Sequence, residues 1–251
     1  MFRVGDDLAV RLPKRAVAAV LIVREQTFLP RLRHRLPLPI PAPLRVGRPQ
    51  EDYPWSWSVQ AWMPGAPVDL NPVAADQGAV LGGFFAALHQ PADADAPRNP
   101  YRGVALATRR AVIETRMDAL AAQGRPLGAQ LMQVWREALA QPMEHETWLH
   151  GDPHSRNVLA QGGRFSAVID WGDCCVGDPA SDLSALWMLL ETPAVRADAI
   201  AAYGGLSDTM LARAKGWAIA MGVMLLEAGL VNDPRLAAAG EATLGRLADG
   251  P

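Results

Sequence analysis

The first residues of the chain alternate between apolar and polar side chains in short runs that favour strands. Residues 2–4 read FRV and residues 7–12 read DLAVRL, and Gly5-Asp6 between them is typical of a turn. These two runs predict a β-hairpin. Residues 16–33 then place apolar side chains at helical spacing, so a helix is expected to follow the hairpin.

Proline dominates the next segment. Residues 36–55 read LPLPIPAPLRVGRPQEDYPW, and so many prolines exclude a helix because each removes a backbone donor and crowds the preceding turn. We expect an extended connector here, leading into a strand at residues 57–62, WSVQAW.

Helical spacing prevails after Met63. An exception is expected at 149–170, where a loop is flanked by short strands. The sequence therefore predicts an α+β chain with a small β-rich part at residues 1–62 and a larger helical part at residues 63–251. The helices are expected near residues 74–89, 105–122, 128–139, 180–190, 195–203, 208–228 and 235–248.

Composition narrows the functional classes. The 251 residues include 24 basic and 26 acidic side chains, and a net charge of −2 gives no strong field for nucleic acid or an anionic membrane. No signal-type N-terminus and no run of 18 apolar residues is apparent, so we expect a cytoplasmic protein without a membrane span. The adjacent Cys174 and Cys175 are expected to be reduced thiols, since neighbouring cysteines bridge each other only with strain.

The segment 148–190 carries the candidate chemistry. It contains an H-x-D-x-x-x-x-N pattern made by His150, Asp152 and Asn157, followed by Ile-Asp-Trp-Gly with Asp170. This spacing resembles the catalytic loop and the metal-binding D-F-G of protein kinases, with Trp171 in place of the phenylalanine. The form HGDPHxxN…IDWGD…GDPxxDL is more similar still to the aminoglycoside phosphotransferase family, which has a kinase-like fold.

The resemblance implies a two-lobed, protein-kinase-like fold over nearly the whole chain. It also implies transfer of the γ-phosphate of ATP or GTP to a hydroxyl of a small molecule. Asp152 would accept or orient the hydroxyl proton, and Asn157 and Asp170 would each give an oxygen to Mg²⁺, a hard ion that prefers such ligands. His154 is a competing acid–base candidate because histidine titrates near neutrality. Taken singly, these residues could equally be turn formers.

Supporting roles follow from the same resemblance. His150 and Asp182 are expected to brace the loop. Asp178 could cap the helix that begins beside it or could meet the substrate, and Asp173 is expected near the substrate.

In the N-terminal part, Arg11 stands where kinases carry a phosphate-binding lysine, and Glu25 would hold it. Lys14 competes with Arg11 for this role, and a surface arginine on a strand is the structural alternative. The resemblance also assigns adenine and cleft contacts to Gln60, Ala61, Trp62, Leu159 and Ile169.

No glycine-rich phosphate loop precedes Arg11, which stands only ten residues after Met1. We therefore expect a shortened N-terminal lobe, weak nucleotide binding, an uncovered sheet edge and a natural reading frame that starts earlier.

Two other functions stay open at this point. A kinase-like binding module without turnover is one. A metal-dependent phosphoesterase is the other, although such enzymes usually need more histidines than the five present here. Either a monomer or a homodimer is compatible with the sequence.

Overall fold

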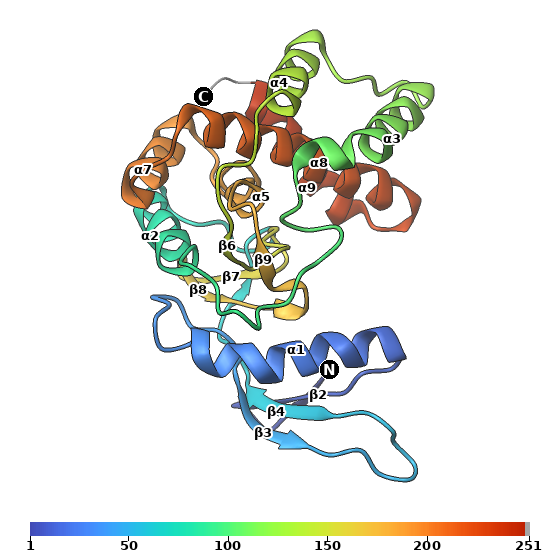
Figure 1. Cartoon of the computed structure of the whole chain (residues 1–251), viewed down its shortest axis with the longest axis vertical. Coiled ribbons are helices and arrows are strands. Elements are labelled where there is room, and N and C mark those ends of the chain that lie inside the picture. The colour runs from blue at the N-terminus through green and yellow to red at the C-terminus, as the bar shows by residue number, and fades with distance from the viewer. Residues whose placement is uncertain (249–251) are drawn as a thin grey trace.

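The computed structural model describes residues 1–248, arranged as a small sheet-and-helix part at one end and a larger, mainly helical part (Figure 1). The small part contains β1 (Phe2–Val4), β2 (Leu8–Arg11), α1 (Ala16–Leu32), β3 (Pro43–Gly47) and β4 (Trp57–Ala61). Its four strands form an antiparallel sheet in the order β1-β2-β4-β3. Helix α1 lies between this sheet and the helical part.

The predicted hairpin and first helix are confirmed. Phe2 pairs with Val10 across the hairpin, and Gly5 takes φ 61° in its turn, a backbone conformation that glycine adopts without strain. The proline-rich segment was expected to be an extended connector, and part of it, Pro43–Gly47, goes further and pairs with β4 as a strand. Since β3 lies at the edge of the sheet, the missing N–H of Pro43 need not remove a ladder hydrogen bond.

The predicted helices of the larger part are all present within a few residues, and Thr192 and Ser207 cap α7 and α8 by accepting backbone N–H bonds. The predicted helix at 180–190 is divided at Ser184 into two short helices. The bounds are α2 (Gly78–Leu88), α3 (Arg110–Ala122), α4 (Ala129–Leu139), α5 (Ala180–Leu183), α6 (Ala185–Leu189), α7 (Pro193–Tyr203), α8 (Asp208–Asn232) and α9 (Pro234–Ala248).

Two small antiparallel sheets lie on the side of the helical part that faces α1. One has the order β5 (Ala66–Pro67), β7 (Val158–Gln161), β8 (Arg164–Val168), and the other joins β6 (Thr147–Leu149) to β9 (Cys175–Gly177). The expected loop with flanking strands at 149–170 is confirmed, whereas β5 and β9 were not predicted. This arrangement places the loop 150–157 between β6 and β7, at the boundary with the N-terminal part.

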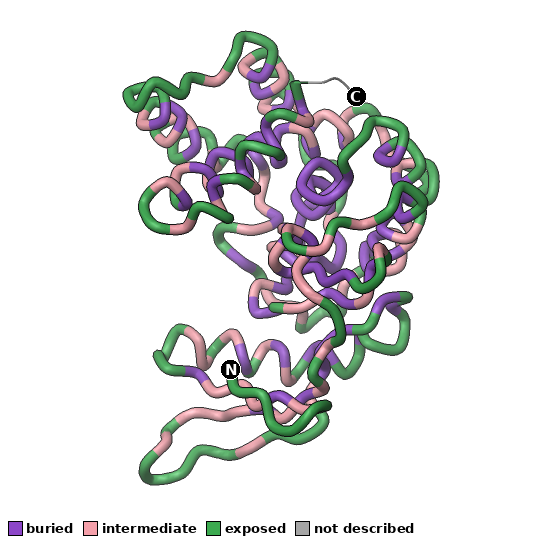
Figure 2. The backbone as a smooth tube through the Cα atoms, turned by 180° about the vertical axis from the view of Figure 1, so that it is seen from behind, coloured by how far each residue is buried: buried purple, intermediate pink, exposed green. Residues whose placement is uncertain are grey.

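The hydrophobic core is concentrated in the helical part, as the buried stretches in Figure 2 show. Helix α8 runs through it and packs on α9, α4, α3 and α5. By length and composition α8 could cross a membrane, but two-thirds of its apolar window is buried inside the protein, as in the core helix of a soluble domain. Arginine, lysine and glutamate side chains interrupt the apolar residues of α8, so it is not an uninterrupted run of 18 apolar residues.

Candidate active site

The loop 150–157 is anchored by one buried carboxylate. Asp182, in α5, is fully buried and accepts the backbone N–H groups of His150 at 2.6 Å and Gly151 at 2.9 Å. His89 Nε2 lies 3.4 Å from the same carboxylate. Asp182 therefore sits where the sequence placed a loop brace, and it satisfies donors that would otherwise be buried without partners.

His150 joins the loop to the strand that ends before Asp170. Its Nδ1 accepts the backbone N–H of Asp152 at 3.1 Å, and its Nε2 lies 2.9 Å from the carbonyl of Ile169. This pattern fits the neutral tautomer with the proton on Nε2. The ring meets Trp171 edge-on with centroids 4.6 Å apart. Both ring nitrogens are occupied, so His150 has a supporting position and no free nitrogen.

Asn157 closes the loop on itself. Its Nδ2 donates to the carbonyl of Asp152 at 3.0 Å, which leaves the amide oxygen as the group available to a ligand. Its own carbonyl accepts the N–H of Ile169 at 2.8 Å. Asp152 and Asn157 are thus held at the two ends of one turn.

Asp170 adopts an unusual backbone conformation at the end of this strand. With φ 61° and ψ 63°, it is the one non-glycine residue among 1–248 in the left-handed region. Aspartate tolerates this region better than most residues, but the conformation still costs free energy and is common at functional sites. Its side chain is half-exposed, and Oδ1 accepts a hydrogen bond from Arg11 Nη2 at 2.8 Å.

Arg11 connects the two parts of the molecule. Besides Asp170, its guanidinium pairs with Glu25, with Nε 2.9 Å from Oε2. Burial raises the pKa of Glu25 to about 7, although the positive charge of Arg11 opposes this shift. Lys14, the competing phosphate ligand, is exposed and does not line the cavity described next.

A cavity of about 280 Å³ lies between the N-terminal sheet and the β7–β8 hairpin. Its lining includes all but one of the residues predicted for nucleotide and metal: Arg11, Gln60, Ala61, Trp62, Asn157, Leu159, Ile169 and Asp170. Glu25 is the exception and reaches the cavity through Arg11. The N–H of Trp62 donates to the carbonyl of Asp7 at 2.7 Å, so it is already engaged. Sequence reasoning missed Ala9, Pro41, Met63, Gly65 and Pro67, which also line the cavity.

The two candidate substrate residues have different surroundings. Asp178 is fully buried, accepts the N–H of Ala180, the first residue of α5, at 3.1 Å, and pairs with Arg213 Nε at 2.8 Å. This burial and ion pair fit a structural position at the start of α5, so the substrate assignment is corrected, and the N-cap residue itself is Pro179. Asp173 is partly exposed and accepts a hydrogen bond from Asn99 Nδ2 at 2.9 Å.

An arginine that sequence reasoning missed contacts the candidate base. Arg102 Nη2 lies 3.0 Å from Asp152 Oδ1, and its Nε lies 3.6 Å from Asp173 Oδ2. Arg102 and Asn99 come from the segment between α2 and α3, which carries no motif and lies some fifty residues before Asp152. No signal in the sequence points to them.

His154 lies beside the candidate base, whereas the two cysteines are unsuited to nucleophilic attack. Burial lowers the pKa of His154, and its Nε2 lies 3.6 Å from Asp152 Oδ2, so the ring is neutral near pH 7 and beside the carboxylate. Cys174 and Cys175 are free, buried thiols, and burial raises the pKa of Cys174 to about 12.

The donor set fits a magnesium ion that is held jointly with a nucleotide. Residues 1–248 contain no group of three or more His, Cys, Asp or Glu side chains that could hold a metal by themselves. Asn157 and Asp170 instead bring an amide and a carboxylate to the same cavity. Mg²⁺ is commonly held by one or two protein oxygens together with phosphate and water.

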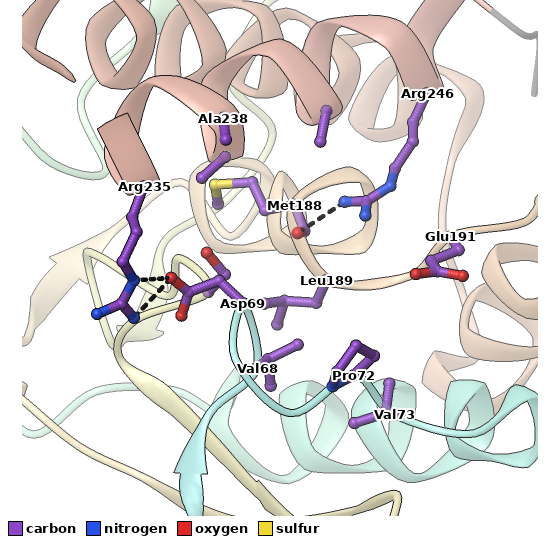
Figure 3. Close-up of a pocket in the computed structure, with 13 residues that line it drawn as sticks. Val68, Asp69, Pro72, Val73, Met188, Leu189, Glu191, Arg235, Ala238 and Arg246 are labelled. Carbon is purple, nitrogen blue, oxygen red and sulfur yellow. Dashed lines mark hydrogen bonds and ion pairs between the residues drawn. The ribbon is translucent and has the colours of Figure 1, made fainter. Parts of the chain in front are cut away.

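A second cavity, of about 240 Å³, lies away from these residues (Figure 3). Arg235, at the start of α9, pairs with Asp69 across it at 2.7 Å, and Arg246 donates to the carbonyl of Met188 at 2.9 Å. Ser155 is the member of the loop 150–157 that lines it. None of the residues predicted for the base, the nucleotide or the metal lines this cavity.

The sheet-and-helix part joined to a helical part, with the loop 150–157 and Asp170 at their boundary, is the architecture of a kinase-like phosphotransferase. The chain belongs to the phosphotransferase enzyme family, whose sequence profile matches residues 1–217. No curated protein matches the chain.

Solved structures with the same fold include aminoglycoside 2'-phosphotransferase-IIIa in its GDP complex, with a TM-score of 0.68 and 18% identity, covering 99% of this chain and 89% of that one. Macrolide 2'-phosphotransferase from Brachybacterium faecium, as apoenzyme, has a TM-score of 0.61 and 23% identity, covering 95% and 85%. A thermostable mutant of an aminoglycoside phosphotransferase of type 4-Ia, in apo form, has a TM-score of 0.56 and 22% identity, covering 100% and 90%. The predicted family and the kinase-like α+β fold are thereby confirmed.

Proposed function

We propose that this chain transfers the γ-phosphate of ATP or GTP to a hydroxyl group of a small molecule. The observation that carries the proposal is the cavity between the two parts, because one arginine, one amide and one carboxylate with suitable charge converge there beside an apolar slot. Residues 1–62 would form the nucleotide-binding lobe and residues 63–251 the lobe with the acceptor site. We place the protein in the cytoplasm.

Within this proposal, the nucleotide base lies against Ala61, Leu159 and Ile169, and Arg11 pairs with its phosphates. Glu25 holds Arg11 from behind, as the 2.9 Å ion pair indicates. Asn157 and Asp170 would hold Mg²⁺, which would neutralise part of the phosphate charge. Arg11 then exchanges part of its contact with Asp170 for contact with phosphate.

In the transfer, one bond to the γ-phosphorus forms as another breaks. The acceptor oxygen forms a bond to the γ-phosphorus while the bond from that phosphorus to the β–γ bridging oxygen breaks, which releases a nucleoside diphosphate. The hydroxyl proton passes to Asp152, whose carboxylate is held by the loop anchored on His150 and Asp182. Positioning and charge stabilisation supply most of the acceleration in such reactions.

The test is a nucleotide-consumption screen against a panel of alcohols and antibiotics, with ATP and GTP in parallel and Asp152→Asn as the blank. The proposal predicts at least one acceptor that wild type phosphorylates in a Mg²⁺-dependent manner and the blank does not. Equal consumption by wild type and the blank with every acceptor would contradict it.

A binding module without turnover is the second candidate, and one observation favours it. Arg102 already occupies Asp152 Oδ1 at 3.0 Å, so the candidate base has a partner before any substrate arrives. If this module is the correct interpretation, the protein binds Mg·ATP by calorimetry, shows no acceptor-dependent turnover, and gains none when Arg102 is replaced with alanine.

A further inference from the structure

The second cavity, of about 240 Å³, is enclosed by four segments that are distant in the sequence (Figure 3). They are the linker after β5, the loop 150–157, the end of α6 and one face of α9. On α9 the lining positions include Arg235, Ala238, Ala242 and Arg246, whose spacing of three and four residues puts them on one side of the helix. The short alanine side chains in the middle of this face leave room for the cavity.

Two polar side chains that line the cavity have a buried atom without a hydrogen-bond partner among residues 1–248. Ser155 is only 4% exposed, and its Oγ is one of these atoms. Asp69 Oδ1 is the other, because Arg235 donates both of its hydrogen bonds, at 3.0 and 2.7 Å, to Oδ2. Buried polar atoms almost always have a partner in folded proteins, so these two indicate a site for a polar ligand.

Arg246 lies at the other end of the cavity from Asp69 and has donors to spare (Figure 3). Its Nη1 donates to the carbonyls of Trp187 at 3.0 Å and Met188 at 2.9 Å. Among residues 1–248, no carboxylate lies within ion-pair distance of Arg246, and its Nε and Nη2 make no hydrogen bond. A guanidinium with free N–H groups is a good partner for a carboxylate.

The four charged side chains that line the cavity cancel in sum, since Arg235 and Arg246 are positive and Asp69 and Glu191 negative. A ligand with a single charge would find an unsuitable charge at one of the two ends. A ligand with both charges finds a partner at each end, and water screens Glu191, which is exposed, from the carboxylate bound to Arg246. The walls between the two ends are apolar and comprise Val68, Pro72, Val73, Met188 and Leu189.

We propose that this cavity binds a small linear zwitterion. Its amino group contacts Asp69, its carboxylate contacts Arg246, and its hydrocarbon chain lies on the apolar walls. Ser155 adds a hydroxyl that can donate or accept a hydrogen bond. The ligand is small because the volume is below that of a drug-sized site. This site is separate from the nucleotide cavity, so the inference does not depend on the proposed phosphotransferase function.

The first experiment compares chains of equal length that differ in charge. Calorimetry is used to titrate 6-aminohexanoate, hexanoate, hexylamine and 1-hexanol at about millimolar concentrations, a range suited to so small a ligand, and 8-aminooctanoate tests a longer span. We expect one of the two zwitterions to bind about tenfold tighter than each of the other compounds. Neither zwitterion has a hydroxyl that could accept a phosphate, so binding is measured apart from turnover. Absence of zwitterion binding, or equal binding of a singly charged analogue, would overturn the proposal.

Ser155→Ala separates a ligand-binding role from a structural one. Because Ser155 Oγ has no partner within the protein, its removal should leave the Tm unchanged or slightly higher, while zwitterion binding weakens about 3–10-fold. Asp69→Asn and Arg246→Gln remove one charge at each end and should each weaken binding about tenfold, with the Tm measured alongside. Wild-type affinity in the Ser155→Ala and Asp69→Asn variants would overturn the proposal.

The location of the site is tested with a larger side chain. Ala242→Leu places bulk inside the cavity and should weaken zwitterion binding at least about tenfold. Ala228→Leu is the matched control, since Ala228 is an exposed alanine of α8 outside the cavity, and binding should stay unchanged. Equal effects of the two leucine variants would contradict this location. Binding should also persist with saturating Mg·ADP, and complete displacement by Mg·ADP would place the zwitterion in the nucleotide cavity instead.

Discussion

The Asp182→Ala substitution removes the acceptor of two buried backbone N–H groups, those of His150 and Gly151. Leaving a buried donor unpaired costs about 1–3 kcal/mol, so the two together cost about 2–6 kcal/mol. A protein of this size loses about 2–4 °C in Tm for each kcal/mol. A midpoint of about 4 kcal/mol therefore predicts a fall in Tm of about 8–16 °C.

The Tm of the Asp182→Ala variant is measured by differential scanning calorimetry, and two further variants serve as controls. Asp182→Asn keeps one acceptor oxygen and should lose about half as much stability. Asp118→Ala changes an exposed aspartate on α3 and should stay within about 2 °C of wild type. If Asp182→Ala melts as close to wild type as Asp118→Ala does, the carboxylate is not bracing the loop and the reasoning from these two hydrogen bonds fails.

Three further outcomes follow from the site. Asp152→Asn should keep the fold and the nucleotide affinity and lower turnover about 10²–10⁴-fold, and a rate within threefold of wild type would remove Asp152 from the mechanism. Asp170→Ala should abolish Mg²⁺-dependent nucleotide binding in calorimetry, and unchanged Mg·ATP affinity would show that the metal lies elsewhere. Burial raises the pKa of Glu25 from 4.5 to about 7, so the folded protein holds a proton that the unfolded chain releases at lower pH. Stability should therefore fall as pH rises from about 4.5 to about 7, by on the order of 3 kcal/mol, and Glu25→Gln should flatten this part of a Tm-against-pH curve, whereas an unaltered slope would contradict the assignment.

The spacing of apolar side chains was enough to predict those helices and strands that are long or are joined by a tight turn. The β1–β2 hairpin and α1 follow from side-chain spacing within one segment, as do the helices after residue 78. The strands β3, β5 and β9 escaped prediction for a different reason. Ala66–Pro67 is too short for alternation to show, and Pro43–Gly47 becomes a strand only because β4 lies beside it, which is information that distant residues supply.

The candidate site divides in the same way. Asp152, Asn157 and Asp170 could be predicted because their spacing within one segment carries the pattern. Asp178 and Asp182 stand four residues apart at one helix start; the resemblance assigned the loop brace to Asp182 but left Asp178 between a capping and a substrate role. Their partners in the structure separate the two roles. Asp178 pairs with Arg213 of α8, whereas Asp182 accepts the backbone N–H groups of the loop.

Arg102 was beyond prediction because its role depends on where a loop without a motif lies in space. Its two contacts, with Asp152 and Asp173, join segments fifty or more residues apart in the sequence. Contacts of this kind are made between loops far apart in the sequence, and the fold alone decides which loops meet.

One buried imidazole links the candidate base to the candidate metal ligand. His150 receives the N–H of Asp152 on Nδ1 and faces the carbonyl of Ile169 with Nε2, and Ile169 immediately precedes Asp170. A second proton on Nδ1 would set two donors against each other at 3.1 Å, so the neutral ring is a condition of this geometry. The spacing between the candidate base and the candidate metal ligand is thus fixed by a rigid ring whose two nitrogens are both engaged within the protein. If the proposed in-line transfer takes place here, it would depend on that spacing, and His150 would act on it by positioning alone.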